Sequence, residues 1–566
     1  ATLRGQVVQG AQSGATEVPL TNVSTGFSRS VQAASDGTYA VPGLPPGTYR
    51  VEARSGEQAS SQTITLRVGQ TATLDLAVAA ASSERTLDTI EVVGTALFEN
   101  KTSEIATYVT PEQISALPQN SRNFLAFADI VPGVQFTENA DGSTQLRSGA
   151  QSSNGINVFI DGVGQKNYVL KGGVSSQDSS RGSPFPQMAI AEYKVITQNY
   201  KAEFDQISSA AVTAVTRSGG NEFEGSVFYD RTSDNWRAST PRELDSGVKP
   251  ETEDEQYGFS FGGPIVRDLL HYFVTYEKKE ILSPRDIIPG ENFQASQLPP
   301  EYASQVGPTN SPFDLDLFFG KLSFAPGDEH LFELTAKYRT ESEITGIGGT
   351  NARSYASSKD NDETRIDLRH QFSGASFLND AHLTFEDAYW NPRPLTLGNG
   401  SRLTTADRRG ILNIGGGQDF QDKGQRGIGF QNDLTYFDFA WQGDHTIKAG
   451  VKYKAVRVDA FEQQPYNPQF FYDISQSTSV PYRVEFGAVV PGISDRNITS
   501  RNKQFGIYLQ DDWQVNDRLT LNLGLRWDYE ETPGYLDYVT RPDLAAALRG
   551  WANIQNTDYD IENYIS

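Results

Sequence analysis

The sequence contains no cysteine, a single methionine (Met188) and no long run of apolar residues. Without cysteine there are no disulfides, no thiolate metal ligands and no cysteine nucleophile, and the absence suits an oxidising compartment. No segment reaches the roughly 18 to 20 consecutive apolar residues that a membrane-spanning helix needs. A helical membrane protein is therefore excluded. A β-barrel is not, because its strands present apolar side chains to lipid only at alternate positions.

Positive charge is also scarce, since 48 Lys and Arg are outnumbered by 71 Asp and Glu, which gives a net charge of −23. An acidic surface repels phosphates, so we do not expect a nucleic-acid partner, and we interpret the charge mainly as a source of solubility. The chain opens Ala1-Thr2-Leu3 with no charged leader, and we expect a mature chain after signal cleavage. Aromatic residues (11%) and 51 glycines favour strands and turns.

Residues 1–80 alternate short β-prone segments with turn signals such as Asp36-Gly37 and Pro45-Pro46-Gly47. This spacing predicts a small β-sandwich. The expected strands are 3–8, 17–23, 39–41, 48–53, 63–68 and 71–78. The run from Asp36 to Tyr49 resembles the carboxypeptidase regulatory-like, transthyretin-type domain. That resemblance implies a structural or interactive role without catalytic residues.

Residues 81–99 form a predicted linker with a short β-prone segment inside it. Small and polar residues at 79–86 are followed by Leu87, Asp88, Thr89, Ile90, Glu91, Val92 and Val93. An ordinary short strand explains this segment as well as a functional role does. Its position between a flexible linker and a new globular region favours function, and the segment resembles a TonB box.

The pattern of segments in residues 100–220 predicts a mixed α/β region. A short helix is expected at 111–114 and another at 121–130, which Pro132-Gly133 would end. Strands are expected at 157–163, 188–196 and 211–216.

From about residue 224 onward one unit repeats: a strand of about ten residues, a tight turn, a second strand and a long polar loop. Residues 518–529 show it best, because six apolar side chains alternate with polar ones without an error: Leu519, Leu521, Leu523, Leu525, Trp527 and Tyr529. A soluble sandwich also alternates. The strand length, the aromatic residues near strand ends and the alternation of short turns with long loops favour a transmembrane barrel.

The pattern contains eleven strands: one at 224–231 and five hairpins. Barrel diameter grows with strand number, and eleven strands would not enclose a folded region of about 120 residues. We therefore expect the N-terminal half of a barrel of about 22 strands in residues 221–566, and a fragment of a longer polypeptide. The predicted fold class is mainly β, with a β-sandwich, a mixed α/β plug and an antiparallel barrel wall.

This order of parts resembles the TonB-dependent outer-membrane receptors, and their Oar-like (OmpA-related) branch in particular. The segments 219–229 and 259–265 look typical of that branch. Arg147 and Gly149 are similar to the family's Ile-Arg-Gly element, and Asp161 and Gly162 to its Asp-Gly turn. Residues 192–200 depart from the Glu-Val-Leu-Arg-Gly-Pro segment usual in siderophore receptors. The departure makes a peptide, protein or glycan a better candidate ligand than an iron chelate.

The resemblance implies a Gram-negative outer-membrane transporter, not an enzyme, with its N-terminal domain in the periplasm. A ligand would bind the extracellular loops and the outward surface of the plug. TonB, with its inner-membrane energising complex, would add the box as a strand to its own sheet. Outer-membrane lipid and lipopolysaccharide are expected neighbours. The alternative is a passive or structural barrel, such as an adhesin or a secretion-associated protein.

Metal sites have little support in the sequence, and we expect no cofactor. The five histidines are dispersed and lack ligand spacing. Calcium is a weak possibility at two acidic runs in predicted extracellular loops, where a solvated loop is the favoured interpretation. The candidates are Glu253, Asp254, Glu255, Asp360 and Asp362. Ligand contacts are expected in the loops at 232–254, 282–316, 343–362, 392–430 and 458–502.

Overall fold

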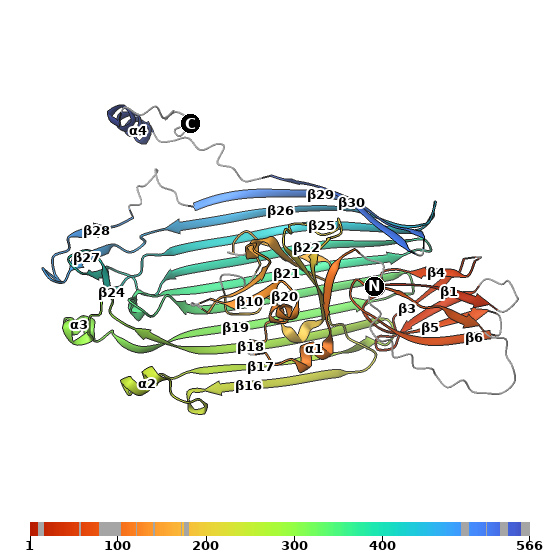
Figure 1. Cartoon of the computed structure of the whole chain (residues 1–566), viewed down its shortest axis with the longest axis horizontal. Helices are drawn as coiled ribbons and strands as arrows, with labels where there is room; N and C mark the ends of the chain where they lie inside the picture. The colour runs from red at the N-terminus through yellow and green to blue at the C-terminus, as the bar shows by residue number, and fades with distance from the viewer. Residues whose placement is uncertain are drawn as a thin grey trace.

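The computed structural model describes 1–9, 16–34, 36–55, 58–78, 103–119, 121–139, 142–170, 173–174, 180–487, 497–516, 518–531 and 542–555. The predicted box at 87–93 lies outside these residues. The fold is mainly β, as predicted, and has three parts along the chain: a sandwich, a compact plug and a broad wall of long strands (Figure 1).

The sandwich packs two four-stranded sheets, ordered β4-β1-β7 with β8 also on β1, and β3-β2-β5-β6. Its strands are β1 Thr2–Gln9, β2 Glu17–Asn22, β3 Ser28–Gln32, β4 Thr38–Val41, β5 Gly47–Ser55, β6 Gln58–Leu66, β7 Thr71–Thr73 and β8 Leu76–Val78. Leu3, Leu20 and Tyr49 are fully buried between the sheets. The sequence interpretation missed β3, whose only large apolar residue is Val31, and merged β7 with β8.

The plug contains a five-stranded sheet in the order β13-β12-β15-β14-β9 and a separate β10–β11 hairpin. Its strands are β9 Ile105–Val109, β10 Val134–Glu138, β11 Thr144–Ser148, β12 Ile156–Ile160, β13 Val163–Gly164, β14 Ile190–Gln198 and β15 Ala210–Thr216. The helical elements are α1 Pro111–Ala116, η1 Phe124–Ile130, η2 Ser153–Gly155 and η3 Gln187–Ala189. Phe124, Tyr193 and Val212 belong to the core.

The two predicted plug helices have different outcomes. Helix α1 forms where expected, because Pro111 occupies its first turn and Thr110 makes a capping box with Gln113. The expected helix at 121–130 is instead a 3₁₀ helix that begins at Phe124. Asn123 precedes it, and its side chain accepts a hydrogen bond from the Leu125 N–H (3.1 Å). This short local bond favours the tighter turn over an α-helix starting at 121.

The wall is one antiparallel sheet of eleven strands, ordered β16-β17-β18-β19-β20-β21-β22-β25-β26-β29-β30, which confirms the predicted strand count. The strands are β16 Glu224–Ser233, β17 Glu253–Val266, β18 Leu270–Ile287, β19 Gly307–Phe324, β20 His330–Thr345, β21 Ser357–Ser373, β22 Phe377–Pro394, β25 Phe420–Ala440, β26 Asp444–Gln463, β29 Asn497–Asn516 and β30 Leu519–Glu530. Within the described residues the sheet stays open, and β16 and β30 form its edges.

The predicted strand length of about ten residues is wrong for most of the wall, since β18, β19 and β22 have 18 residues each. Alternation stops before the strands do. On β19 the outward side chains are apolar at Phe324, Leu322 and Phe318, whereas Asp316 and Asp314, further along the same face, pair with Lys278. Pairing of the backbone continues beyond the apolar belt, where lipid no longer dictates the side chains.

The long connections are also more ordered than predicted. Segments 392–430 and 458–502 contribute a second sheet, ordered β24-β23-β27-β28. Its strands are β23 Gly400–Thr404, β24 Gly410–Gly415, β27 Gln469–Asp473 and β28 Arg483–Glu485. Leu298, Tyr302 and Ile347, from two other connections, pack on its Leu403, Ile411 and Leu412. These connections also contain η4 Asp234–Trp236, α2 Pro241–Ser246, η5 Ala295–Gln297, α3 Pro300–Ala303 and η6 Arg353–Tyr355, and α4 Pro542–Gln555 follows β30.

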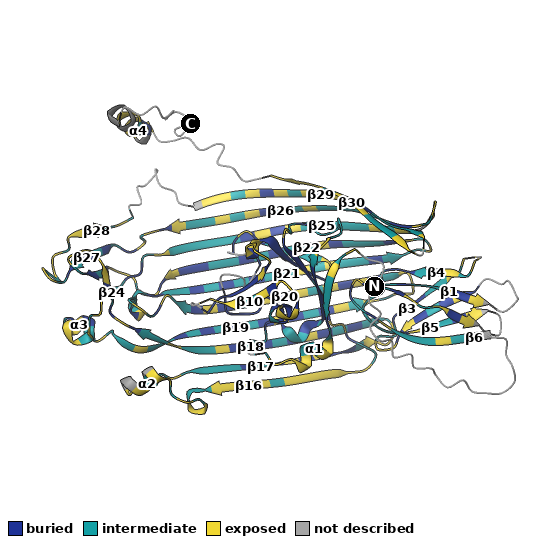
Figure 2. Ribbon diagram, viewed as in Figure 1, coloured by how far each residue is buried: buried dark blue, intermediate teal, exposed yellow. Residues whose placement is uncertain are grey.

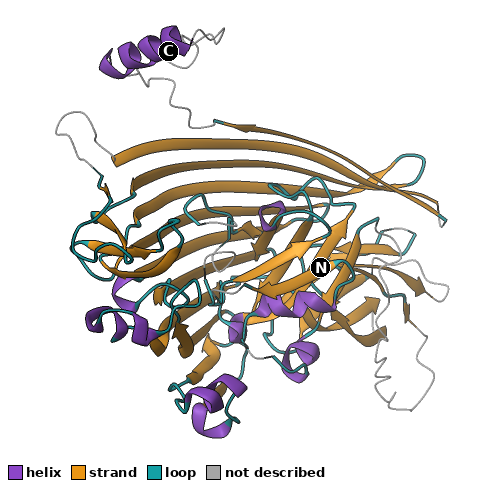
Figure 3. Cartoon of the chain, turned by 60° about the vertical axis from the view of Figure 1, so that its left-hand side comes forward, coloured by secondary structure: helices purple, strands orange, loops and turns teal. Residues whose placement is uncertain are grey.

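The sandwich lies beyond the end of the wall where the short turns are (Figure 1). The second sheet lies at the opposite end, with the long loops. The plug lies against the concave face of the wall (Figure 3). Arg29 of the sandwich donates hydrogen bonds to the side chains of Gln371 and Ser373 near the β21–β22 turn, and each bond is 3.0 Å long. Ser28 donates to Asp328 at the β19–β20 turn (2.7 Å).

Burial alternates along inner wall strands such as β19 and β20, whereas the edge strands β16 and β30 are mostly exposed (Figure 2). On β20, Leu334 is 41% exposed although Arg339 is 0% exposed. The face toward the plug is polar and buried, and the opposite face is apolar and exposed. None of the helices in the described residues is long and apolar enough to span a bilayer.

Candidate functional site: the contact between plug and wall

The predicted Asp161-Gly162 turn joins β12 to β13, and both residues adopt left-handed backbone angles, with φ of 49° and 94°. Gly162 suits this conformation because it has no Cβ. The Asp161 carboxylate accepts hydrogen bonds from the backbone N–H of Thr216 (2.9 Å) and from its hydroxyl (2.6 Å). Thr216 ends β15, so the turn is fastened to the segment through which the plug continues into the wall.

A chain of buried charges extends from this turn across four wall strands. Lys321 of β19 lies 3.6 Å from Asp161 and 2.9 Å from Glu333 of β20. Arg369 of β21 contacts Glu333 (3.0 Å) and Asp380 of β22 (2.6 Å). Each charge has an opposite partner, which offsets the cost of removing it from water. The Asp-Gly turn is thus tied electrostatically to the wall.

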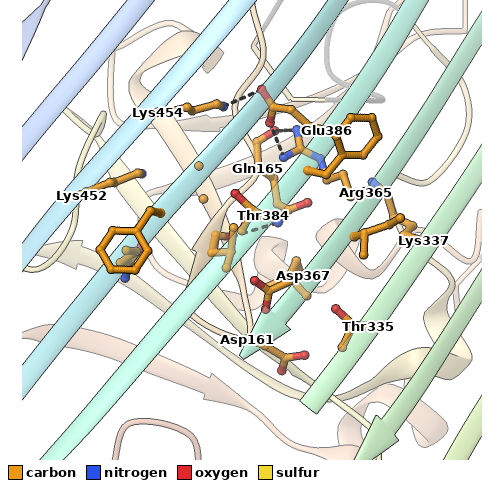
Figure 4. A pocket seen from close by; sticks show the side chains of 18 of the residues that line it. Asp161, Gln165, Thr335, Lys337, Arg365, Asp367, Thr384, Glu386, Lys452 and Lys454 are labelled. Atoms are coloured by element: carbon orange, nitrogen blue, oxygen red, sulfur yellow. Dashed lines mark hydrogen bonds and ion pairs between the residues drawn. The ribbon is translucent and has the colours of Figure 1, made fainter. Parts of the chain in front are cut away.

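A second group of buried charges lies further from the short turns (Figure 4). Lys337 of β20 pairs with Glu363 (2.8 Å), and Glu386 of β22 pairs with Arg365 (2.9 Å) and Lys454 (2.8 Å). The same three cations also donate to backbone carbonyls of the plug: Lys337 to Pro184 (3.2 Å), Arg365 to Gln165 (2.7 Å) and Lys454 to Lys166 (3.2 Å). The cations therefore satisfy plug carbonyls that lie outside any helix or sheet.

A cavity of about 60 Å³ separates the Asp-Gly turn from the wall, which leaves room for a few water molecules. Its polar lining includes Asp161, Gln165, Lys337, Arg365, Asp367, Glu386, Lys452 and Lys454 (Figure 4). Most of these side chains already have partners in the two charge groups. Beside these polar side chains the contact includes an aromatic one, since the ring of Phe185 of the plug lies 5.1 Å from that of Phe319 of β19.

Toward the long loops, Arg339 and Glu341 of β20 form a pair whose side chains are both 0% exposed. Arg339 also donates to the plug, through the Ser183 carbonyl (3.2 Å) and the Ser180 hydroxyl (3.0 Å). In the reverse direction Arg181 of the plug lies 2.9 Å from Glu343 of the wall. At this level the wall supplies an arginine to acceptors of the plug, and the plug supplies an arginine to a carboxylate of the wall.

Near β26 and β29 the plug supplies the carboxylates. Asp205 pairs with Lys452, and Glu203 lies 3.3 Å from Lys448. Burial alone would raise the pKa of Asp205, but the Lys452 ammonium outweighs it and holds that pKa below 3.8. Burial likewise opposes ionisation of Glu203, whose pKa is nevertheless lowered by Lys448 and Lys201. Both carboxylates are therefore charged anchors at neutral pH.

Arg147 and Gly149 do not join Asp161 in one site. Arg147 is exposed on β11, opposite Gln135 of β10. Gly149 follows with φ of 60°, and its N–H donates to the Gly133 carbonyl (2.9 Å). Arg147 and Gly149 therefore belong to the β10–β11 hairpin.

The acidic runs offered as weak calcium candidates lie on strands, so their expected placement in loops is wrong. Glu253, Asp254 and Glu255 begin β17, and Asp360 and Asp362 belong to β21. Alternation along β17 sends Asp254 to the face opposite Glu253 and Glu255, whereas Asp360 and Asp362 share one face of β21. In the part of the chain that the structure describes, no group of three or more His, Asp or Glu could hold a metal ion.

The sequence reasoning missed the inner-face charges. A signal was present on β20, where Glu333, Lys337, Arg339, Glu341 and Glu343 occupy alternate positions of a strand with an apolar opposite face. Charges at that spacing beside an apolar face indicate a wall that contacts something polar.

Comparison with known proteins gives this geometry a family. The model of the outer membrane beta barrel domain matches residues 215–288 and 285–537, and that of the carboxypeptidase regulatory-like domain matches 2–79. The TonB-dependent transporter Oar of Myxococcus xanthus is 23% identical over 88% of this chain and 54% of its own length. The ferric enterobactin receptor of Pseudomonas aeruginosa is 24% identical over 78% of this chain and 56% of its own.

Solved structures share the fold. The outer membrane transporter YddB of Escherichia coli aligns with a TM-score of 0.57 at 14% identity, over 75% of this chain and 56% of that one. The siderophore receptor PirA of Acinetobacter baumannii gives 0.53 at 16% identity, over 76% and 57%. The chain spans just over half the length of the curated relatives it matches.

The chain belongs to the outer-membrane β-barrel family. Within it, the chain is a homologue of the Oar TonB-dependent transporter with a carboxypeptidase regulatory-like domain at residues 2–79. The predicted family, fold class and outer-membrane location are confirmed. The relatives are transporters and receptors, not enzymes.

Proposed function

We propose that this chain supplies the sandwich (1–80), the linker with its box (81–99), the plug (100–220) and half of the wall (221–566) of a TonB-driven transporter. The observation that carries the proposal is the polar contact between plug and wall, which runs from Asp161 to Arg339. Ion pairs and hydrogen bonds can be exchanged for water when a plug moves, whereas an apolar contact would resist wetting. A force applied to the plug can therefore open a path along the wall.

The box at Leu87–Val93 is the proposed point of attack for TonB. The plug begins near the wall, since the Ser103 N–H donates to Asn522 of β30 (3.1 Å). Short turns of such barrels face the periplasm, and the sandwich lies at that end. A segment joining sandwich to plug would then be within reach of a periplasmic partner. Pairing as an added strand needs only β-prone residues and a free backbone.

The test measures binding of the purified periplasmic domain of TonB to the full-length receptor in detergent. Ile90→Pro and Val92→Pro each remove a ladder donor, so binding should be lost. Ser83→Pro, in the linker before the box, is the matched control and should bind normally. Equal binding by all three variants would refute the box.

Ligand entry is proposed at the long-loop end, where a groove of about 360 Å³ lies between Arg181 of the plug and the extensions of β18, β19 and β20. The second sheet adds arginine–aromatic contacts there, with Arg408 over Tyr482 (3.5 Å) and Arg402 over Phe471 (5.3 Å). Arginine and aromatic side chains suit a large polar ligand such as a peptide, protein or glycan. Mass spectrometry of material co-purified with the receptor would identify the class.

A ferric chelate is the second candidate ligand, because one relative is a ferric enterobactin receptor. Iron-dependent growth that requires this receptor would favour the chelate over a polymer. A passive barrel is the competing function, and it predicts the same uptake or adhesion with and without TonB in the host strain.

A further inference from the structure

Three arginines lie side by side on the outward face of the wall near its long-loop end. In the register of the sheet, Arg426 of β25 pairs directly with Arg457 of β26, and Arg457 pairs with Arg501 of β29. The side chains of Arg426 and Arg457 are 72% and 59% exposed, and Arg501 is exposed as well. They point away from the plug, since Gln425 and Lys454 on the same strands point toward it.

This arginine row marks the upper border of the apolar belt. Two residues toward the short turns, the same face carries Ile428, Ala455 and Lys503. Two residues further, it carries an aromatic row that is paired from strand to strand: Phe430, Tyr453, Phe505 and Tyr529. Phe430 and Tyr529 are 45% and 54% exposed, as expected for side chains facing lipid. Because long loops are extracellular in this family, the row lies at the headgroup level of the outer leaflet.

Like charges directly opposite one another destabilise a sheet, so three adjacent arginines carry a cost. Carboxylates offset part of it: Asp387 lies 2.6 Å from Arg426, and Asp459 lies 2.9 Å from Arg457. Lys503 has Glu531 at 3.4 Å. Within the described residues, no carboxylate pairs with Arg501. Four cations thus meet three carboxylates on a chain whose net charge is −23.

We propose that Arg426, Arg457 and Arg501, with Lys503, bind the phosphate groups of lipid A from lipopolysaccharide in the outer leaflet. Guanidinium groups bind phosphate through paired hydrogen bonds, and the exposed arginines can turn toward an anion in the headgroup layer. The aromatic row below them receives the acyl chains of the same molecule. This site is separate from the transport path, because it lies on the opposite face of the wall from the plug.

Native mass spectrometry of the full-length receptor in detergent tests the site with three probes: lipid A, dephosphorylated lipid A and inorganic phosphate. The unaltered receptor should retain lipid A and lose most of that retention when the phosphates are removed. The double variant R457A/R501A should bind lipid A about tenfold more weakly for each arginine removed. R457K/R501K keeps the charge and should recover part of the binding.

The matched control is Arg231→Ala, which removes an exposed wall arginine of β16 that pairs with Glu253 (2.5 Å). It should leave lipid A retention unchanged. Equal retention by R457A/R501A and the unaltered receptor would overturn the proposal, as would equal retention of dephosphorylated lipid A. Binding of inorganic phosphate as tight as that of lipid A would reduce the row to an anion site and also contradict it.

Discussion

The inner and outer faces of the same wall strands obey opposite rules. On β20, Arg339 points inward and is 0% exposed, whereas Leu334 points outward and is 41% exposed. A water-soluble sheet would bury the leucine and expose the arginine. The sandwich of this chain does so, with Leu20 at 0% and Arg54 at 56% side-chain exposure. The difference shows that the wall is built for lipid on one side and a polar partner on the other.

The largest expected effect is on the inner face, from Arg339→Ala. The substitution leaves Glu341 buried without its closest cation and frees the Ser183 carbonyl. Breaking one half of a buried pair costs about 3–5 kcal/mol. Urea unfolding of the reconstituted protein measures it. The double variant R339M/E341L should lose much less than R339A, and a loss below about 1 kcal/mol for R339A would contradict the role of the pair.

On the outer face, Leu334→Arg should cost about 2–4 kcal/mol if the position lies near the middle of the bilayer. The same strand offers a matched control in Thr340→Arg, which is beyond the last aromatic of the belt, Tyr338. There the cost should fall to about 0–1 kcal/mol. Equal costs at both positions in lipid vesicles would place the belt elsewhere.

A smaller, pH-dependent effect is expected at the plug edge. The pKa of Asp205 is held below 3.8 in the folded protein, so its contribution to stability is complete above 3.8. The contribution is lost as the pH falls through the lower folded pKa. The urea midpoint of the unaltered protein should therefore drop on acidification, and D205N should lack that part of the drop. If the urea midpoints of the unaltered protein and of D205N fall equally with pH, the Asp205–Lys452 pair does not anchor the plug.

The smallest effect belongs to an exposed pair. Arg54 and Glu52 of the sandwich lie 2.5 Å apart, but their side chains are 56% and 26% exposed, so Arg54→Ala should change stability by no more than about 0.5 kcal/mol. The Arg54–Glu52 and Arg339–Glu341 pairs are both in direct contact and differ in burial, so comparing R54A with R339A shows the effect of burial on the loss of stability. A loss as large as that of R339A would remove the distinction.

The sequence predicted the outer face far better than the inner one. Lipid requires an apolar side chain at every second position, so Leu519 to Tyr529 show the strand directly, and the same rule yields the count of eleven. The inner charges follow a long-range rule instead. Lys321, for example, contacts Asp161 and Glu333 from different parts of the chain, and no local pattern contains that pairing.

Pairing over long distances also explains the missed second sheet. β23 lies parallel to β27 although the two strands come from connections separated by β25 and β26. Neither strand has the apolar–polar alternation of the wall, so only polar loops were predicted there. The predicted turn at Asp161-Gly162 was local, and it forms. Its ties to Thr216 and Lys321 required the fold.

One set of strands separates lipid on its outer face from a buried polar contact on its inner face. Nitroxide labels placed one at a time at residues 332–341 of β20 test it directly, and the absence of cysteine in these 566 residues keeps the labelling specific. In lipid vesicles, collisions with oxygen should be frequent at 332, 334, 336 and 338. The intervening positions should be immobile and poorly accessible to both oxygen and a water-soluble relaxant. Uniform oxygen access, or free access of the water-soluble relaxant to the intervening positions, would show that β20 does not separate lipid from a buried face.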